Sequence, residues 1–200
     1  LLENNQYHFF LLYNINLHPQ NIYKKPTHLS YIEAASMPLV FMTAYEMLIH
    51  RAKLKPNQKI LIYGGASGVG SAAIQIAKKL NCRIYTTIGN KNKIGYIKQL
   101  GCENILIHSR NNWYKKLKNL RFDVIFEHIG KETWDISLKL LEKGGVIVTC
   151  GATTGAEVSL NLNHLFYKQQ SIVGSTMGSI DSFKNVMTGI EKKYYVFEHF

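Results

Sequence analysis

Residues 59–80 constrain the fold of this chain more than any other stretch, because three different patterns meet there. Ile60 to Tyr63 is apolar and β-branched, which is typical of a buried strand. A glycine cluster follows, and from Ser71 the apolar side chains recur at helical spacing. The first N–H groups of a helix lack intrahelical partners, and the helix dipole is positive at that end. The strand, turn and helix together therefore predict a phosphate-binding turn.

The glycine cluster matches the dinucleotide-binding fingerprint in part. Within Gly65 to Gly70, Ser67 stands where the Gly-x-Gly-x-x-Gly pattern has its second glycine. The strand before the turn and the helix after it favour dinucleotide binding, and the alternative is a purely structural glycine-rich turn. A side chain at Gly68 or Gly70 would hold the diphosphate or the neighbouring strand away.

The alternation of strand and helix continues along the chain. Five further strands are expected, at residues 83–88, 104–107, 122–126, 145–149 and 171–174. Helices are expected from Ser30 up to Pro38, and then at residues 39–52, 71–80, 91–100, 112–120, 131–141, 160–167 and 180–190. These patterns predict an α/β fold with a doubly wound, parallel Rossmann sheet. The loops that follow its strands would meet at one edge, where ligands bind, and the sixth strand would lie at the sheet's side edge.

The end of the second strand bears on the choice of dinucleotide. An NAD site usually places Asp or Glu about 20 residues after the fingerprint, to accept the ribose hydroxyls. Here Ile88 occupies that place and is followed by Gly-Asn-Lys-Asn-Lys at residues 89–93. Amide and ammonium donors suit the 2′-phosphate of NADP(H). The alternative is an ordinary lysine-rich helix start in a lysine-rich chain.

Composition narrows the classes of function that remain. The formal net charge is +11, but the lysines are spread through the sequence, which argues against specific nucleic-acid binding. No apolar run approaches the length of a membrane span, so no membrane association is expected. Three cysteines (Cys82, Cys102, Cys150) are far apart and lack metal-ligand spacing. They favour a reducing, cytoplasmic environment.

Several segments carry a family resemblance. They are Met37 to Leu48, Ser67 to Lys78, Phe122 to Gly130, Gly144 to Gly155, and Ser171 to Gly178. In this order they resemble the medium-chain dehydrogenase/reductase superfamily, in the branch of quinone oxidoreductases and zinc-binding alcohol dehydrogenase-like proteins. The resemblance implies hydride transfer between nicotinamide and a small carbonyl, enone or quinone substrate.

The resemblance also implies roles for individual residues. Thr43 would contact the nicotinamide end of the cofactor. The diphosphate would be held by Ser67, Gly68, Val69 and Gly70. Asn90 and Lys93 would bind the 2′-phosphate, and His108 would lie beside the adenosine. The nicotinamide would be lined by Ile129, Gly130, Cys150 and Gly151.

The family's domain plan covers this chain only in part. Residues 1–29 are expected to be the last strands of a GroES-like, all-β catalytic domain, residues 30–190 the Rossmann domain, and residues 191–200 a tail with no counterpart. The family's metal-ligating Cys and His would precede this sequence, so no metal ligand is assigned. A zinc-dependent alcohol dehydrogenase and a non-catalytic nucleotide- or RNA-binding module remain alternatives. The apolar edge strand at residues 171–174 predicts a homodimer.

Two other residue groups are interpreted as structural. Glu127 and His128 could form an acid/base pair, but neighbours in a strand point to opposite faces, which favours a structural or cofactor-lining role. Cys150 is a packing residue rather than a nucleophile, since no histidine is placed to activate it.

Overall fold

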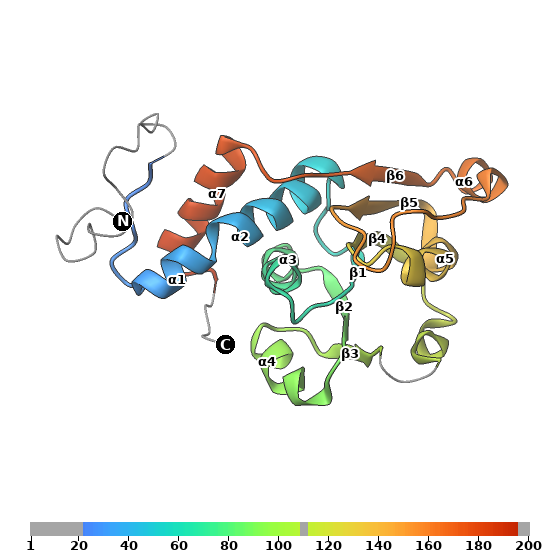
Figure 1. Cartoon of the computed structure of the whole chain (residues 1–200), viewed down its shortest axis with the longest axis horizontal. Coiled ribbons are helices and arrows are strands. Elements are labelled where there is room, and N and C mark those ends of the chain that lie inside the picture. Colours follow the sequence, from blue (N-terminus) through green and yellow to red (C-terminus); the bar gives the residue numbers. More distant parts are fainter. Residues whose placement is uncertain (1–21, 109–111, 196–200) are drawn as a thin grey trace.

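The structure is a computed structural model that describes residues 22–108 and 112–195. Its sheet contains six strands, all parallel, in the order β3-β2-β1-β4-β5-β6 (Figure 1). The strands are β1 (Lys59–Ile62), β2 (Arg83–Ile88), β3 (Asn104–Ile107), β4 (Phe122–Glu127), β5 (Leu141–Thr149) and β6 (Ser171–Gly174). This order confirms the predicted doubly wound Rossmann sheet and places β6 at one side edge.

Helices cover both faces of the sheet. They are α1 (Tyr31–Ser36), α2 (Pro38–Tyr45), α3 (Gly68–Lys79), α4 (Ile94–Gln99), α5 (Lys131–Leu140), α6 (Leu162–Tyr167) and α7 (Ile180–Glu191). In Figure 1, α2, α3, α4 and α7 lie to one side of the strands and α5 to the other. The alternation of side chains along β1 agrees with this arrangement, because Ile60 and Ile62 join the core of the first layer and Leu61 joins that of the second.

Several predicted bounds shift in the structure. The fifth strand was expected at residue 145 but begins at Leu141, because its ladder with β4 continues through an irregularity. Gly144, which looks like a turn residue in the sequence, has a φ of +73° within that strand. The amphipathic helix expected at residues 112–120 is a 3₁₀-helix, Trp113–Leu117, in which Leu117 alone is buried. A single apolar anchor gives little burial to support a longer helix.

Two helix starts also differ from expectation. Helix α3 begins at Gly68 rather than Ser71, because Ser67 is its N-cap. The helix expected at residues 91–100 consists of a 3₁₀ turn, Lys91–Lys93, followed by α4. Pro38 stands at the first turn of α2, where its missing N–H costs nothing, and a π-helical segment, Glu46–Arg51, continues that helix.

The expected N-terminal remnant lies mostly outside the described residues. Residues 1–21 belong to that part, and residues 22–29 contain no strand. The division of the chain at residue 29 stays a prediction.

The predicted tail is partly ordered against the domain. Glu191 belongs to α7, and Tyr195 is buried with its ring centroid 4.8 Å from that of Phe41. A Cβ atom at Gly189 would lie 2.6 Å from the Tyr195 ring, so the absence of a side chain there makes room for it. Tyr195 is therefore part of the packed structure, residues 192–194 are exposed, and residues 196–200 lie outside the described residues.

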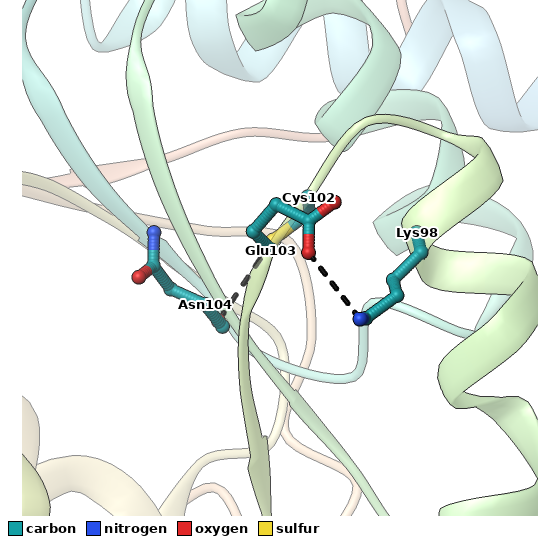
Figure 2. Close-up of polar contacts among 4 residues, drawn as sticks. All are labelled: Lys98, Cys102, Glu103 and Asn104. Carbon is teal, nitrogen blue, oxygen red and sulfur yellow. Dashed lines mark hydrogen bonds and ion pairs between the residues drawn. The ribbon is translucent and has the colours of Figure 1, made fainter.

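The turn between α4 and β3 carries an exposed ion pair and a buried cysteine. Figure 2 shows the Lys98 ammonium 3.5 Å from the Glu103 carboxylate. The Cys102 thiol lies 3.8 Å from the backbone carbonyl of Asn104, and burial raises its pKa to about 12. All three cysteines are free thiols. Among the described helices, none combines the length and the apolar character that a membrane crossing requires.

Candidate nucleotide-binding site

The turn between β1 and α3 is held by its own backbone and by hydroxyl groups. Ser67 caps α3, and its hydroxyl oxygen accepts the N–H of Gly70 at 3.1 Å. Thr87 of β2 supports the turn from below, since its hydroxyl oxygen accepts the Gly64 N–H at 3.0 Å and its carbonyl accepts the Gly65 N–H at 2.9 Å. Ser67 thus replaces the second fingerprint glycine with a residue that fixes the start of the helix.

The glycines of this turn permit close approach, each to a different neighbour. A Cβ atom at Gly70 would lie 2.2 Å from the carbonyl oxygen of Gly64, so this glycine packs the helix against the turn. A Cβ atom at Gly68 would lie 2.8 Å from Val40 of α2. A side chain at Gly68 was expected to hold off the diphosphate or the neighbouring strand, but it would first meet α2.

The turn fits a diphosphate. Gly68 and Val69 are the first two residues of a 12-residue helix, where backbone N–H groups have no intrahelical acceptor. Ser67 and Gly68 are exposed, and no acidic residue lies in the first turn of the helix. Donors without acceptors at the positive end of a helix dipole suit an anion. The four residues predicted to hold the diphosphate are thus contiguous, but only Ser67 and Gly68 are exposed, Val69 is half-buried, and Gly70 is buried with its N–H donated to Ser67.

The structure brings the predicted 2′-phosphate residues and His108 to one corner of the sheet edge. Asn90 caps the 3₁₀ turn, with its side-chain oxygen accepting the Asn92 N–H at 2.9 Å, and Asn90 and Lys93 are both exposed. His108 follows β3, and its ring lies beside the same loop, because a Cβ atom at Gly89 would be 3.3 Å from its Nε2 atom. Desolvation lowers the pKa of His108 below its ordinary value, and the Glu132 carboxylate partly offsets this.

The residues predicted at the nicotinamide end come together where β4 and β5 end. A Cβ atom at Gly151 would lie 3.4 Å from the carbonyl oxygen of His128, so the two loops pack closely. Gly130 has a φ of +92°, and a Cβ atom there would lie 2.5 Å from the Gly155 carbonyl oxygen. Burial, followed by the negative charge of Glu127, raises the pKa of the half-buried Cys150 thiol, which agrees with its interpretation as a packing residue.

Thr43 occupies a buried position on α2. Its hydroxyl donates to the carbonyl of Leu39 at 2.8 Å, one turn earlier in the same helix. Its oxygen can still accept a hydrogen bond, but the contact with nicotinamide stays a prediction.

Sequence reasoning did not identify the group of polar side chains beneath the β4–α5 turn. Glu127, at the end of β4, is fully buried. One carboxylate oxygen accepts the N–H groups of Ile129 at 2.6 Å and Gly130 at 3.2 Å. The other lies 2.8 Å from the Thr133 hydroxyl and 3.1 Å from the Ser137 hydroxyl. The i, i+4 spacing of Thr133 and Ser137 on the buried face of α5 was the available signal, but it does not point to a partner.

His128 connects this turn to the β1–α3 turn. Its Nε2 atom lies 2.9 Å from the carbonyl oxygen of Tyr63, so the N–H must be on that nitrogen. Its ring lies against Gly64, where a Cβ atom would come within 3.0 Å. Glu127 and His128 thus have separate structural partners, as the strand alternation predicted.

No metal centre is found among residues 22–108 and 112–195, where no three His, Cys, Asp or Glu side chains gather as a metal ion requires. The residues that the structure describes therefore do not fit a zinc ion.

Comparison with known proteins agrees with this geometry. The family model described as zinc-binding dehydrogenase matches residues 68–192. The quinone oxidoreductase of Homo sapiens is 30% identical over 162 residues, which cover 79% of this chain and 49% of that protein. The chain spans about half the length of the curated relatives it matches.

Solved structures share the fold. A 2-octenoyl-CoA carboxylase reductase, solved in complex with NADP and 2-octenoyl-CoA, has a TM-score of 0.83 at 27% identity, covering 88% of this chain and 45% of that one. An NAD-dependent alcohol dehydrogenase has a TM-score of 0.82 at 33% identity, covering 89% of this chain and 53% of that one.

Proposed function

The chain belongs to the zinc-binding dehydrogenase family, within the medium-chain dehydrogenases/reductases, and from this premise we propose that it binds NADP(H) as part of an oxidoreductase. The observation that carries the proposal is the β1–α3 turn, in which Ser67 caps the helix and Gly70 lets it approach Gly64. When bound, the nicotinamide ring would donate or accept a hydride. The protein's own residues would hold the diphosphate, orient the ring and exclude water.

The preference for NADP(H) over NAD(H) rests on the end of β2. Ile88, Gly89 and Asn90 provide no carboxylate for the ribose hydroxyls, while Lys91 and Lys93 add positive charge to an exposed loop. The complex of the 2-octenoyl-CoA carboxylase reductase with NADP supports this choice, and the NAD-dependent alcohol dehydrogenase is the reason to test it.

Replacement of Lys93 by Ala tests the cofactor directly. NADPH binding should weaken by about 1–2 kcal/mol, the scale of one charge-assisted contact, while NADH binding stays nearly unchanged. Lys139→Ala is the matched control, because Lys139 is exposed near the C-terminal end of α5, at the opposite edge of the sheet. Equal losses for NADPH and NADH in a fluorescence titration would reject the 2′-phosphate assignment.

The substrate is proposed to be a small carbonyl, conjugated enone or quinone. The reduction or formation of this substrate needs hydride transfer. No residue of this chain is assigned a catalytic role in that step. A zinc-dependent alcohol dehydrogenase is the second candidate, favoured by the match of residues 68–192 to the zinc-binding dehydrogenase family. The two candidate enzymes differ in their need for zinc. Turnover that is unchanged in the presence of a strong chelator would favour the zinc-free reductase.

A homodimer through β6 is part of the proposal. β6 pairs with β5 on one side and forms the sheet edge on the other. Large apolar side chains are exposed on the neighbouring α6, among them Leu162, Phe166 and Tyr167. An unpaired edge beside exposed apolar groups favours pairing with a second copy about a two-fold axis. Sedimentation of a monomer at tens of micromolar would exclude this interface.

A further inference from the structure

We propose that Glu127 is a positioning residue that holds the β4–α5 turn in the shape needed at the nicotinamide end of the cofactor. The inference rests on the proposed function and adds to it a residue that touches neither substrate nor cofactor. Glu127 acts through Ile129 and Gly130, the two turn residues whose N–H groups its carboxylate accepts.

The carboxylate is suited to this task because its neighbours donate to it. The two backbone N–H groups can only donate, and they share one carboxylate oxygen. On the other oxygen, the Thr133 hydroxyl donates at 2.8 Å, and the Ser137 hydroxyl is a second donor at 3.1 Å. The Tyr63 hydroxyl lies 2.9 Å from Ser137 and can donate to it, so the Ser137 proton is shared between Glu127 at 3.1 Å and the Thr133 carbonyl at 2.9 Å. Burial raises the pKa of Tyr63, so its proton stays in place.

The peptide groups of Ile129 are held from both sides. Its N–H donates to Glu127, and its carbonyl oxygen accepts both the N–H and the hydroxyl of Thr154, each at 2.8 Å. Gly130 follows with φ +92° and ψ −126°, a backbone shape that other residues rarely adopt. Without the carboxylate, two N–H groups of this turn would lose their acceptor. The turn would then relax toward a conformation in which these groups find another acceptor.

The site separates into two parts, which makes the inference testable. The diphosphate and 2′-phosphate are assigned to the ends of β1 and β2, whereas Glu127 controls the end of β4. A change at Glu127 should therefore weaken contacts to nicotinamide and spare contacts to the rest of the cofactor. The probes are NADPH and 2′-phospho-ADP-ribose, which is the same molecule without nicotinamide.

Two variants of Glu127 differ in whether the side chain can accept the backbone N–H groups. Glu127→Met keeps the length of the side chain but removes both acceptors. Glu127→Gln keeps one oxygen for the backbone N–H groups, and its amide can donate to the Thr133 and Ser137 hydroxyls, which can accept. We expect Glu127→Met to lose about tenfold in affinity for NADPH and to keep its affinity for 2′-phospho-ADP-ribose. Glu127→Gln should bind both ligands nearly as the unmodified protein does.

The outcomes separate the two proposals. Equal losses of both ligands in Glu127→Met, or no loss of NADPH, would overturn the positioning role while the cofactor assignment stands. If the unmodified protein binds neither ligand, the proposed function itself fails. Should Glu127→Met not fold by circular dichroism, Thr154→Val removes the hydroxyl contact to the Ile129 carbonyl from the other side. It should lose NADPH affinity selectively, by about threefold, and an equal loss of both ligands would again overturn the inference.

Discussion

Two strand-to-helix turns lie at the same edge of the sheet and are built in opposite ways. The close packing of the β1–α3 turn depends on the absence of a side chain, because Gly70 lets the helix approach the Gly64 carbonyl. The β4–α5 turn is shaped by a buried side chain, Glu127, which accepts its N–H groups. In the first turn, the Gly68 and Val69 N–H groups at the start of α3 have no intrahelical acceptor, whereas in the second turn the Glu127 carboxylate accepts the Ile129 and Gly130 N–H groups. This difference is the reason that we assign the diphosphate to the first turn and the nicotinamide ring to the second.

The largest expected effect breaks the first turn. Gly70→Ala would place a Cβ atom 2.2 Å from the Gly64 carbonyl oxygen and 2.9 Å from the Gly65 Cα atom, and neither backbone group can move freely. We expect a loss of about 3 kcal/mol or more in the free energy of unfolding, measured in urea. Gly95→Ala is the control, because nothing lies within 4 Å of its Cβ position in α4. That variant should be as stable as the unmodified protein or slightly more stable.

The next largest effect is expected from a substitution beneath the β4–α5 turn. Ser137→Ala removes a hydroxyl that lies between the Glu127 carboxylate and the buried Tyr63 hydroxyl. Two buried polar groups would lose a partner, which should cost about 2 kcal/mol of stability by chemical unfolding. A cost below that of Ser67→Ala would show that the carboxylate does not depend on its hydroxyl donors.

Ser67→Ala tests the helix cap of the first turn. The variant loses the helix cap on Gly70 but keeps the backbone shape, so we expect a cost of about 1 kcal/mol. Ser67→Asp also retains a capping oxygen and should restore most of the stability in thermal unfolding. The same Asp variant should bind NADPH poorly, since its charge would repel the diphosphate.

The smallest effect is expected at Glu103, an exposed carboxylate that serves as the reference for the buried Glu127. Glu103 pairs with Lys98, and the two side chains are 73% and 54% exposed. Glu103→Gln should change the free energy of unfolding by less than about 0.5 kcal/mol, because water screens such a pair. A cost comparable to that of Ser137→Ala would contradict the distinction between buried and exposed carboxylates.

The fold could be predicted because its signals are local. Ile60 to Tyr63 and the glycines after it identify a βα unit, and the repeating strands and helices identify the sheet. The start of β5 could not be predicted, because its ladder passes through Gly144, and glycine more often ends a strand.

The shape of the β1–α3 turn could likewise be predicted, because consecutive residues form it, and its role in binding phosphate stays a prediction. The group around Glu127 could not, since Tyr63 and Ser137 are 74 positions apart and only the packing of α5 on the sheet brings them together. Polar residues in a predicted buried strand and helix indicate hydrogen bonds but do not name the partners.

The burial of Tyr195 has a practical consequence for shortening this chain. Its ring fills the space above Gly189 and contacts Phe41, so it joins α7 to α2 after the last regular helix has ended. A recombinant version cut at the end of α7 would remove that ring and leave its apolar neighbours exposed to water. The safe boundary for expression therefore lies after Tyr195, four residues beyond the last helical one.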